Sequence, residues 1–205
     1  MPIYQLKNIS ELGKIGIWNI TENTDRLLHL LSNKGFDTTT IPKKKNDLHL
    51  KQWLAVRLLC YEFLNDFEIN YAKNGKPLLT NGLGFSVSHS GNYAAIIIND
   101  TPCGIDIEKV SEKVDRIKHK FLNKAELDDI HSSDHPLRML TIYWSAKEAL
   151  YKLYGKKELI FQDQLLISPL KDADLFNGTI QTKKMKHSYT LKVEFFEEYV
   201  LVYTI

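Results

Sequence analysis

Two carboxylates stand on alternate residues of an otherwise apolar stretch, CGIDIEKV, which begins at Cys103. Residues two apart on a strand point to the same side, so Asp106 and Glu108 should project together while Ile105 and Ile107 enter the core. The two charges repel each other, and a divalent cation would relieve that repulsion. Hard oxygen ligands suit Mg²⁺, which is usually shared with substrate phosphates. For a D-x-E pattern alone, a solvated edge strand is the alternative.

A second cluster, WSAKEALYK at residues 144–152, is expected to lie on a helix. Glu148 and Lys152 share one face of that helix because they are four residues apart, a spacing that an ordinary surface salt bridge also has. Together with the strand carboxylates, Glu148 would be a third metal ligand or a general base. Lys147 and Lys152 would then neutralise phosphate oxygens.

The first half of the chain supplies side chains that suit phosphate groups. They are Arg57 in a long helix, Lys76 in NGKP, and Ser88 and His89 in the polar turn SHSGN. The stretch PKKKNDLHLK adds three lysines at residues 43–45 and Lys51. This basic patch is either a solvated helix lead-in or a phosphate-binding rim.

Composition and missing motifs exclude several classes. The 205 residues are 43% hydrophobic and 25% charged, which is typical of a globular chain, and a net charge of +2 is small for a dedicated nucleic-acid binder. The motifs of zinc proteases, serine hydrolases, zinc ribbons and dinucleotide folds are absent. Cys60 and Cys103 have no metal-type spacing and are expected to be packing residues. Without a signal peptide or a membrane-spanning run, the chain is expected in the cytoplasm.

The elements that must position these residues follow from hydrophobic periodicity and capping signals. Helices are predicted over residues 24–35, 48–64, 111–121, 123–131 and 136–155, and strands over 14–21, 85–87, 93–98, the quoted 103–110 stretch and four runs of the tail. Asn74-Gly75 is a hairpin turn signal. Asn123 and Glu126 form a capping-box pattern, and Gly155 ends the last helix.

Both halves therefore combine a long helix with several strands, which indicates an α+β fold in two lobes, residues 1–102 and 103–205. No convincing residue-level repeat relates them. The CGIDIE stretch falls at the junction of the lobes, where sites often form.

The two motifs together resemble the 4′-phosphopantetheinyl transferase superfamily. Its pattern is G-[I/V]-D-x-E followed by [W/F]-[S/T/C]-x-K-E-[A/S]-x-x-K, and every defined position is matched, from Gly104 to Lys152. WLAVR, GKP and FSVSHSGNYAAI occur in the order of the larger, surfactin-synthetase-type branch. The resemblance therefore covers roughly residues 43–152.

The resemblance implies a monomer of two pseudo-symmetric lobes, each a small, mainly antiparallel sheet packed with a long helix, with the active site in the cleft between them. It implies transfer of the 4′-phosphopantetheine group from coenzyme A to a serine of an acyl or peptidyl carrier protein, with release of adenosine 3′,5′-bisphosphate. Asp106, Glu108 and Glu148 would hold Mg²⁺, or Mn²⁺ in its place. Glu148 would take the serine proton and Lys152 would offset charge on the phosphoryl group.

The resemblance also implies a set of residues that contact coenzyme A. They are Lys44, Lys51, Arg57, Lys76, Pro77, Ser88, His89, Asp106, Lys147 and Lys152. No short motif decides which lysine of residues 43–51 matches the basic positions of the family. Carrier proteins are typically acidic around their serine, so a basic rim would favour encounter, and salt would weaken that effect.

Two other functions stay open from the residues alone. Acidic residues beside E-x-x-x-K also describe metal-dependent nucleases and phosphodiesterases. A catalytically silent module that binds coenzyme A or a carrier is the second. Neither nucleic acid nor a membrane is expected as a partner.

Overall fold

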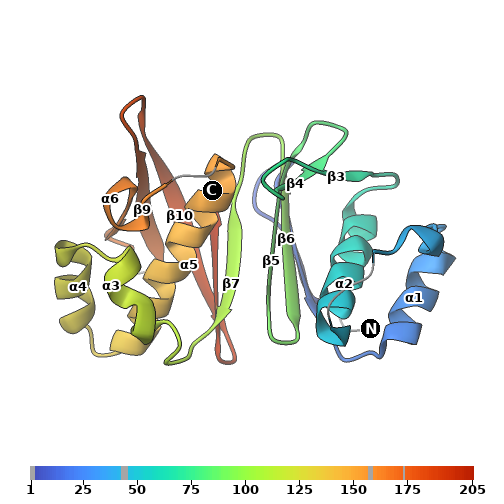
Figure 1. The fold of residues 1–205 in the computed structure, drawn as a ribbon, viewed down its shortest axis with the longest axis horizontal. Coiled ribbons are helices and arrows are strands. Elements are labelled where there is room, and N and C mark those ends of the chain that lie inside the picture. Colours follow the sequence, from blue (N-terminus) through green and yellow to red (C-terminus); the bar gives the residue numbers. More distant parts are fainter. Residues whose placement is uncertain (1–2, 43–45, 157–158, 173) are drawn as a thin grey trace.

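The computed structural model describes residues 3–42, 46–156, 159–172 and 174–205. A four-stranded antiparallel sheet in the order β1-β2-β6-β5 and a five-stranded antiparallel sheet in the order β7-β11-β10-β9-β8 lie side by side, each with helices on its outer side (Figure 1). The strands are β1 (Ile3–Asn8), β2 (Lys14–Asn19), β3 (Ile69–Tyr71), β4 (Pro77–Leu79), β5 (Gly84–Ser90), β6 (Tyr93–Asn99), β7 (Ile105–Lys109), β8 (Leu165–Pro169), β9 (Leu175–Gln181), β10 (Lys186–Phe196) and β11 (Tyr199–Thr204). Helices beside antiparallel sheets confirm the α+β class.

Helix α2 (Asp47–Phe63) packs on the four-stranded sheet, and α1 (Thr24–Asn33) lies outside it (Figure 1). The Asn46 side chain caps α2 by accepting from the His49 amide. Leu54 and Leu59 of α2 are fully buried and pack in one core cluster with Ile96 of β6. Burial of each such side chain stabilises the fold by about 1.5–3 kcal/mol.

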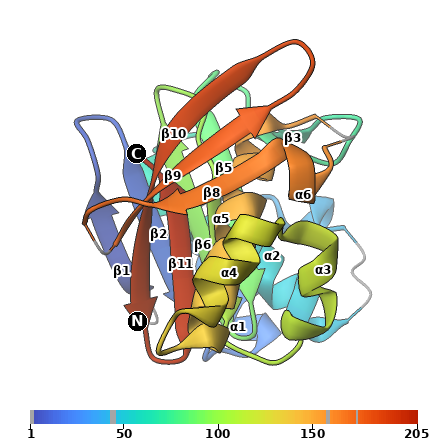
Figure 2. The same ribbon diagram turned by 90° about the vertical axis from the view of Figure 1, so that its left-hand side faces the viewer.

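Helix α5 (Pro136–Tyr154) packs on the five-stranded sheet, and the short helices α3 (Lys118–Phe121), α4 (Lys124–His131) and α6 (Phe161–Gln164) complete that half (Figure 2). Pro136 stands in the first turn of α5, and Gly155 ends the helix in the left-handed conformation at φ 65°. Asn123 and Glu126 form the expected capping box at the start of α4. These sequence predictions are confirmed.

The inner faces of the two sheets share an apolar core. Ile15, Ile17 and Ile97 of the four-stranded sheet are fully buried, as are Ile105 and Ile107 of β7, and all five belong to one cluster. Such packing joins the halves through side chains that are removed from water. The division between residues 102 and 103 falls between β6 and β7 and stays a prediction, as does pseudo-symmetry.

The edge strands β5 and β7 face each other where the sheets meet (Figure 1). Ser88 and His89 were expected in a polar turn, but they belong to β5, which continues to Ser90. The turn itself is Gly91-Asn92, and Gly91 has φ 53°. A two-residue hairpin turn needs positive φ at its centre, and that requirement keeps the strands paired up to the turn. The polar composition of SHSGN had concealed a strand.

Three smaller observations complete the fold. β1 was not expected from the sequence; it forms the edge of the first sheet. Cys60 and Cys103 are free and buried, as expected for packing residues. Within the described ranges, no helix combines the length and apolar character needed to cross a membrane.

Candidate active site

Asp106 lies on β7 and is only 3% exposed. Its Oδ1 accepts two hydrogen bonds, from Ser88 Oγ at 2.8 Å and from Lys152 Nζ at 2.7 Å. Its Oδ2 is buried and has no hydrogen-bond partner among the described residues. A buried carboxylate oxygen without a partner is uncommon and points to a ligand that completes the site.

Glu108, two residues further along β7, is held by side chains from both halves of the protein. Ser90 Oγ donates to its Oε2 at 3.0 Å, and Trp144 Nε1 of α5 donates to its Oε1 at 3.4 Å. Burial raises the pKa of Glu108, and the negative charge of Asp106 raises it further. The negative charge of Asp106 therefore acts on Glu108, which agrees with the repulsion that their spacing predicts.

Glu148 of α5 is the third carboxyl group of the cluster. Burial raises its pKa to about 7; Asp106 and Glu108 add to the rise, and Lys152 opposes it. No hydrogen bond joins the Glu148 carboxyl group to another described residue, so this group is available to a ligand. A carboxyl group with a pKa near neutrality suits proton transfer at physiological pH.

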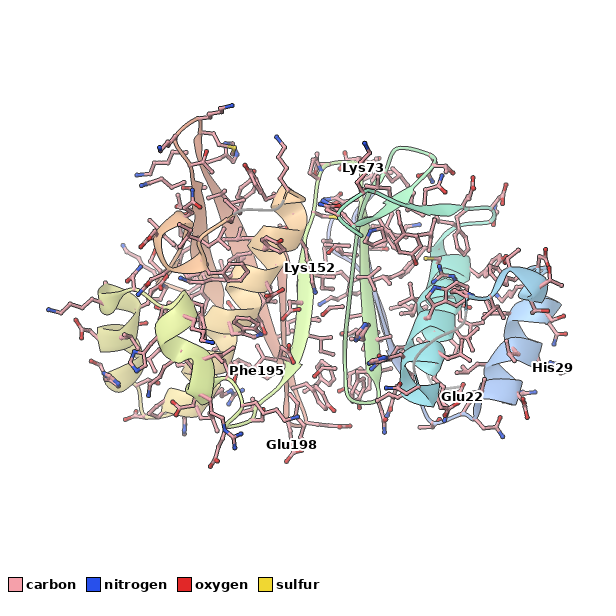
Figure 3. All side chains as sticks on the ribbon, viewed as in Figure 1. Glu22, His29, Lys73, Lys152, Phe195 and Glu198 are labelled. Carbon is pink, nitrogen blue, oxygen red and sulfur yellow. The ribbon has the colours of Figure 1, made fainter. Side chains whose placement is uncertain are left out.

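Lys152 projects from α5 toward β7, one turn beyond Glu148 (Figure 3). Besides Asp106 it donates to the Ile105 carbonyl oxygen at 3.1 Å. A quarter of its side chain remains exposed, so this ammonium group borders both the carboxylates and solvent. The structure therefore brings together Asp106, Glu108, Glu148 and Lys152.

The cluster fits a hard divalent cation by its chemistry. Asp106, Glu108 and Glu148 supply anionic oxygen donors, and the pKa values of Glu108 and Glu148 are raised by burial and by neighbouring carboxylates, so positive charge is favoured here. Asp106 Oδ2, which has no hydrogen-bond partner among the described residues, adds a donor. Within the described ranges, no three His, Cys, Asp or Glu side chains are already drawn together as a metal cage. Lys152 holds the neighbouring oxygen of Asp106. Metal binding by these residues stays a prediction.

Two adjoining cavities lie beside this cluster. The first, about 380 Å³, is lined by α2 and β5 and includes Arg57 and His89 in its wall. The second, about 240 Å³, lies between the β3–β4 hairpin and the end of α5, and its wall includes Lys76 and Lys152. Pro77 belongs to both walls, so the cavities are neighbours. An elongated ligand could occupy both.

Arg57 is 5% exposed, and no described carboxylate pairs with it. Its guanidinium group lies 3.2 Å from the centre of the Trp53 ring, and Nη2 donates to Tyr71 Oη at 3.1 Å. Burial lowers the pKa of Arg57. A buried cation with unused donors and no acidic partner is suited to an anionic ligand group.

Lys76 has a structural contact that was not predicted. Its Nζ donates to the Leu153 carbonyl oxygen at 3.1 Å, at the C-terminal end of α5, where a cation is favoured by the helix dipole. Asn74 Nδ2 donates to the Gly155 carbonyl oxygen at 2.7 Å beside it. The β3–β4 hairpin thus caps α5, and Lys76 still forms part of the second cavity wall.

The expectation that Lys147 contacts coenzyme A requires correction. Lys147 is 0% exposed, and its Nζ donates to Glu126 Oε2 at 2.7 Å and to two backbone carbonyl oxygens. All three of its N–H donors are thus used inside the second half. The residue lies next to Glu148 in the sequence, but one residue along a helix turns the side chain by about 100°. Lys147 therefore faces α4, not the cavities.

Two further basic residues, Lys51 and Lys44, are expected from the sequence to contact coenzyme A. Lys51 forms an ion pair with Asp47 at 2.8 Å on its own helix, and it lines neither of the two cavities. Lys44, with Lys43 and Lys45, lies outside the described residues. Of the sequence-predicted cavity residues, the structure gathers Arg57, Lys76, Pro77, His89 and Lys152.

Several residues of the site were not singled out from the sequence. Trp144 and Ser90 both donate to Glu108, and in the sequence each is only one member of a motif or of a polar stretch. Trp53 and Tyr71 surround Arg57. Only a four-residue helical spacing links Trp53 to Arg57 in the sequence, and no signal links Tyr71 to it.

The part of the chain that carries the three carboxyl groups is similar to known proteins. A family model described as the 4′-phosphopantetheinyl transferase superfamily matches residues 102–204, which carry all three carboxyl groups and Lys152. A 4′-phosphopantetheinyl transferase of Bacillus pumilus, psf-1, is 34% identical over 87 residues, which are 40% of this chain and 37% of that protein. Another of Bacillus subtilis, ffp, is 29% identical over 145 residues, which are 66% of this chain and 65% of that protein.

Similarity extends to enterobactin synthase component D of Salmonella typhi, which is 29% identical over 85 residues, 40% of this chain and 36% of that protein. The chain thus spans between 36% and 65% of the length of these relatives. The matched family region contains both sequence motifs.

Proposed function

The chain belongs to the 4′-phosphopantetheinyl transferase superfamily, and from this premise we propose that it transfers the 4′-phosphopantetheine group of coenzyme A to a serine of an acyl or peptidyl carrier protein. The product would be the holo carrier protein, and adenosine 3′,5′-bisphosphate would be released. The relatives named above as 4′-phosphopantetheinyl transferases support this class of reaction.

One observation carries the proposal most directly. Asp106 and Glu108 of β7 raise the pKa of Glu148 of α5, and Lys152 of α5 donates a hydrogen bond to Asp106. This is the arrangement expected of a site for a metal and a pyrophosphate group, because it combines hard anionic ligands with a cation. An ordinary surface salt bridge leaves its carboxylate oxygens in contact with water. Asp106 Oδ2 is instead buried, and it has no hydrogen-bond partner among the described residues.

In the proposed reaction, the carrier serine hydroxyl attacks the phosphorus that bears the pantetheine arm. A new bond forms between the serine oxygen and phosphorus, and the bond from that phosphorus to the bridging oxygen of the pyrophosphate breaks. Glu148 accepts the serine proton, for which its pKa of about 7 is suited. Lys152 offsets negative charge on the transferred group, and the leaving oxygen departs with adenosine 3′,5′-bisphosphate.

Asp106, Glu108 and Glu148 would hold Mg²⁺ or Mn²⁺, and the bound ion would neutralise pyrophosphate charge and help orient the group. Arg57 and His89 would border the nucleotide part of coenzyme A in the first cavity, with Lys76, Pro77 and Ser88 nearby. The Trp53 ring would keep the Arg57 guanidinium in place. Asp106 would thus serve both the metal and, through Lys152, the phosphoryl group.

We further propose the organisation that goes with this activity. Residues 1–102 would form the lobe on the coenzyme A side and residues 103–205 the lobe with the metal and catalytic motifs, related by pseudo-symmetry within a cytoplasmic monomer. The second cavity is lined by residues of both β5 and α5, which supports a site at the boundary of these segments.

The test is to mix the purified protein with coenzyme A, Mg²⁺ and a panel of apo carrier proteins from fatty-acid, polyketide and peptide synthesis. The expected result is that at least one carrier gains the mass of one phosphopantetheine arm on its serine. A Ser→Ala carrier is the control and should gain nothing. No gain on any carrier would overturn the proposal, and degradation of nucleic acid with Mg²⁺ but without coenzyme A would favour the phosphodiesterase alternative.

A further inference from the structure

Both β5 and β7 are edge strands, yet their facing backbone groups are not paired with each other as a sheet. In an antiparallel pair, alternate residues of an edge strand direct their N–H groups away from the neighbouring strand. For β7 these are Ile105, Ile107 and Lys109, and two of the three are buried. Buried N–H groups need acceptors.

Three serines of β5 provide those acceptors. Ser86 Oγ accepts from the Ile105 amide, Ser88 Oγ from the Ile107 amide and Ser90 Oγ from the Lys109 amide, each at 3.2 Å. The serines are two residues apart, so they lie on one side of β5 and match the spacing of the alternate amides of β7. We call these residues the serine ladder. It fixes the register of β7 against β5.

The rungs of the serine ladder differ in what else they do. Ser88 Oγ also donates to Asp106 Oδ1 at 2.8 Å, and Ser90 Oγ donates to Glu108 Oε2 at 3.0 Å. Ser86 makes the same contact to a β7 amide but has no carboxylate partner among the described residues. A comparison of Ser86 and Ser90 therefore separates the register of the strands from the orientation of a carboxylate.

We propose that Ser90 is a positioning residue for the metal site: through its hydroxyl, the half that would bind coenzyme A orients the Glu108 carboxylate of the other half. This inference rests on the metal-dependent transfer proposed above and names a further residue on which that site depends. Ser90 is suited to the role because one hydroxyl group satisfies the Lys109 amide and the Glu108 carboxylate together. A hydrogen bond to one oxygen of a carboxylate directs the rest of the group toward its ligand.

The test compares the binding of Mn²⁺ alone to Ser90→Ala, Ser86→Ala and Ser90→Thr. Binding is measured from the electron paramagnetic resonance signal of the Mn²⁺ that stays free in solution. Partners of metal ligands typically change metal affinity 10- to 100-fold, so Ser90→Ala is expected to weaken Mn²⁺ binding about tenfold. Ser86→Ala leaves the buried Ile105 amide without its acceptor, so it should lower the urea midpoint at least as much as Ser90→Ala does. It should change Mn²⁺ affinity less than about twofold. Ser90→Thr keeps the hydroxyl and should bind Mn²⁺ like the wild type.

A second measurement does not depend on how stable the variants are. In a Glu108→Gln background, Ser90→Ala should cause no further loss of Mn²⁺ affinity, because the residue acts through Glu108. Equal loss in Ser86→Ala and Ser90→Ala, or loss in the Glu108→Gln background, would overturn the positioning role and leave the proposed function standing. Failure of the wild type to bind Mn²⁺ would instead overturn the metal assignment, and this inference with it.

Discussion

Lys152 and Asp106 form an ion pair between α5 and β7, in which Nζ lies 2.7 Å from Oδ1, while Oδ2 of the same carboxylate has no hydrogen-bond partner among the described residues. Lys152 thus engages one oxygen of this buried carboxylate and leaves the other oxygen available to a ligand. The pair joins the two motifs of the sequence, and it shows how a cation can stabilise the cluster before any ligand arrives.

Lys152→Met should destabilise the protein, because Asp106 would keep its buried charge without its cation. Removal of one partner of a buried pair costs about 3–5 kcal/mol, and partial exposure of Lys152 should reduce this to about 1–3 kcal/mol. Urea unfolding measures the loss. Addition of Mg²⁺ should restore part of the lost stability.

Lys156→Met, at an exposed lysine near the same helix end, is the control and should change stability by less than about 0.5 kcal/mol. An equal loss in both variants would contradict the role of the ion pair.

The raised pKa of Glu148 predicts a pH dependence of stability. Its folded pKa is about 7 and its ordinary value is 4.5, so between these values the folded state binds more protons than the unfolded state. The contribution of Glu148 to stability therefore falls as pH rises through this window. Glu148→Gln removes the contribution, and the variant should become more stable than the wild type above pH 7. Thermal unfolding from pH 5 to pH 8 without metal is the measurement; parallel curves would refute the prediction.

Mg²⁺ should show the complementary behaviour. Because metal and proton compete for the same carboxylates, the rise in melting temperature caused by Mg²⁺ should be larger at pH 8 than at pH 5.5. The Glu148→Gln protein should show a smaller rise with less pH dependence. A rise of equal size at both pH values would mean that Mg²⁺ binds elsewhere.

Much of this fold could be predicted because its signals are local. The apolar spacing in α2 and α5, the capping box at Asn123 and the left-handed Gly155 each depend on a few neighbouring residues. The pairing of Asp106 with Glu108 follows from strand periodicity alone. The family motif then linked these residues to Glu148 and Lys152 across the chain.

Other parts could not be predicted because they depend on how elements meet. Lys147 and Glu148 are neighbours in the sequence and point to different sides of α5. The sequence does not say which of these sides faces the cavities and which faces Glu126. The serine ladder depends on the register of two edge strands from different sheets. Its polar residues also resemble a turn, which is why the end of β5 was missed.

Lys147→Met tests the structural role now given to this residue. Lys147 and Glu126 are almost completely buried, so loss of the lysine should cost about 3–5 kcal/mol by leaving Glu126 charged and unpaired. The double variant Lys147→Met/Glu126→Gln should recover a large part of that stability, since no buried charge remains. Urea unfolding checks both. The KM for coenzyme A should stay within about twofold of the wild type in the folded double variant; a large rise would return Lys147 to the binding site.

Arg57→Gln should weaken binding of coenzyme A through the loss of an anion contact. Because charge-assisted hydrogen bonds contribute about 1.5–3 kcal/mol, the KM should rise about tenfold or more. If the contact is to the 3′-phosphate, 3′-dephospho-coenzyme A should bind the variant and the wild type with similar affinity. Tyr71→Phe is the matched control, because it removes a partner of Arg57 and leaves the cation. An equal loss for both nucleotides in Arg57→Gln would place the anion contact elsewhere.

Gly104, the glycine of the first motif, lets β7 approach the backbone of α5. A Cβ atom at this position would lie 2.0 Å from the Ala149 carbonyl oxygen, so Gly104→Ala must push α5 away from β7. Overpacking of this kind costs about 1–3 kcal/mol, and here it should also separate Glu148 from Asp106 and weaken Mn²⁺ binding. Gly178→Ala, in β9, is the control, because the new atom would meet only the flexible ends of Leu191 at 2.7 Å and Leu150 at 2.8 Å. Gly178→Ala should lower stability less than Gly104→Ala does and should leave Mn²⁺ affinity unchanged. If Gly104→Ala also bound Mn²⁺ like the wild type, the metal site would not depend on the close approach of β7 to α5.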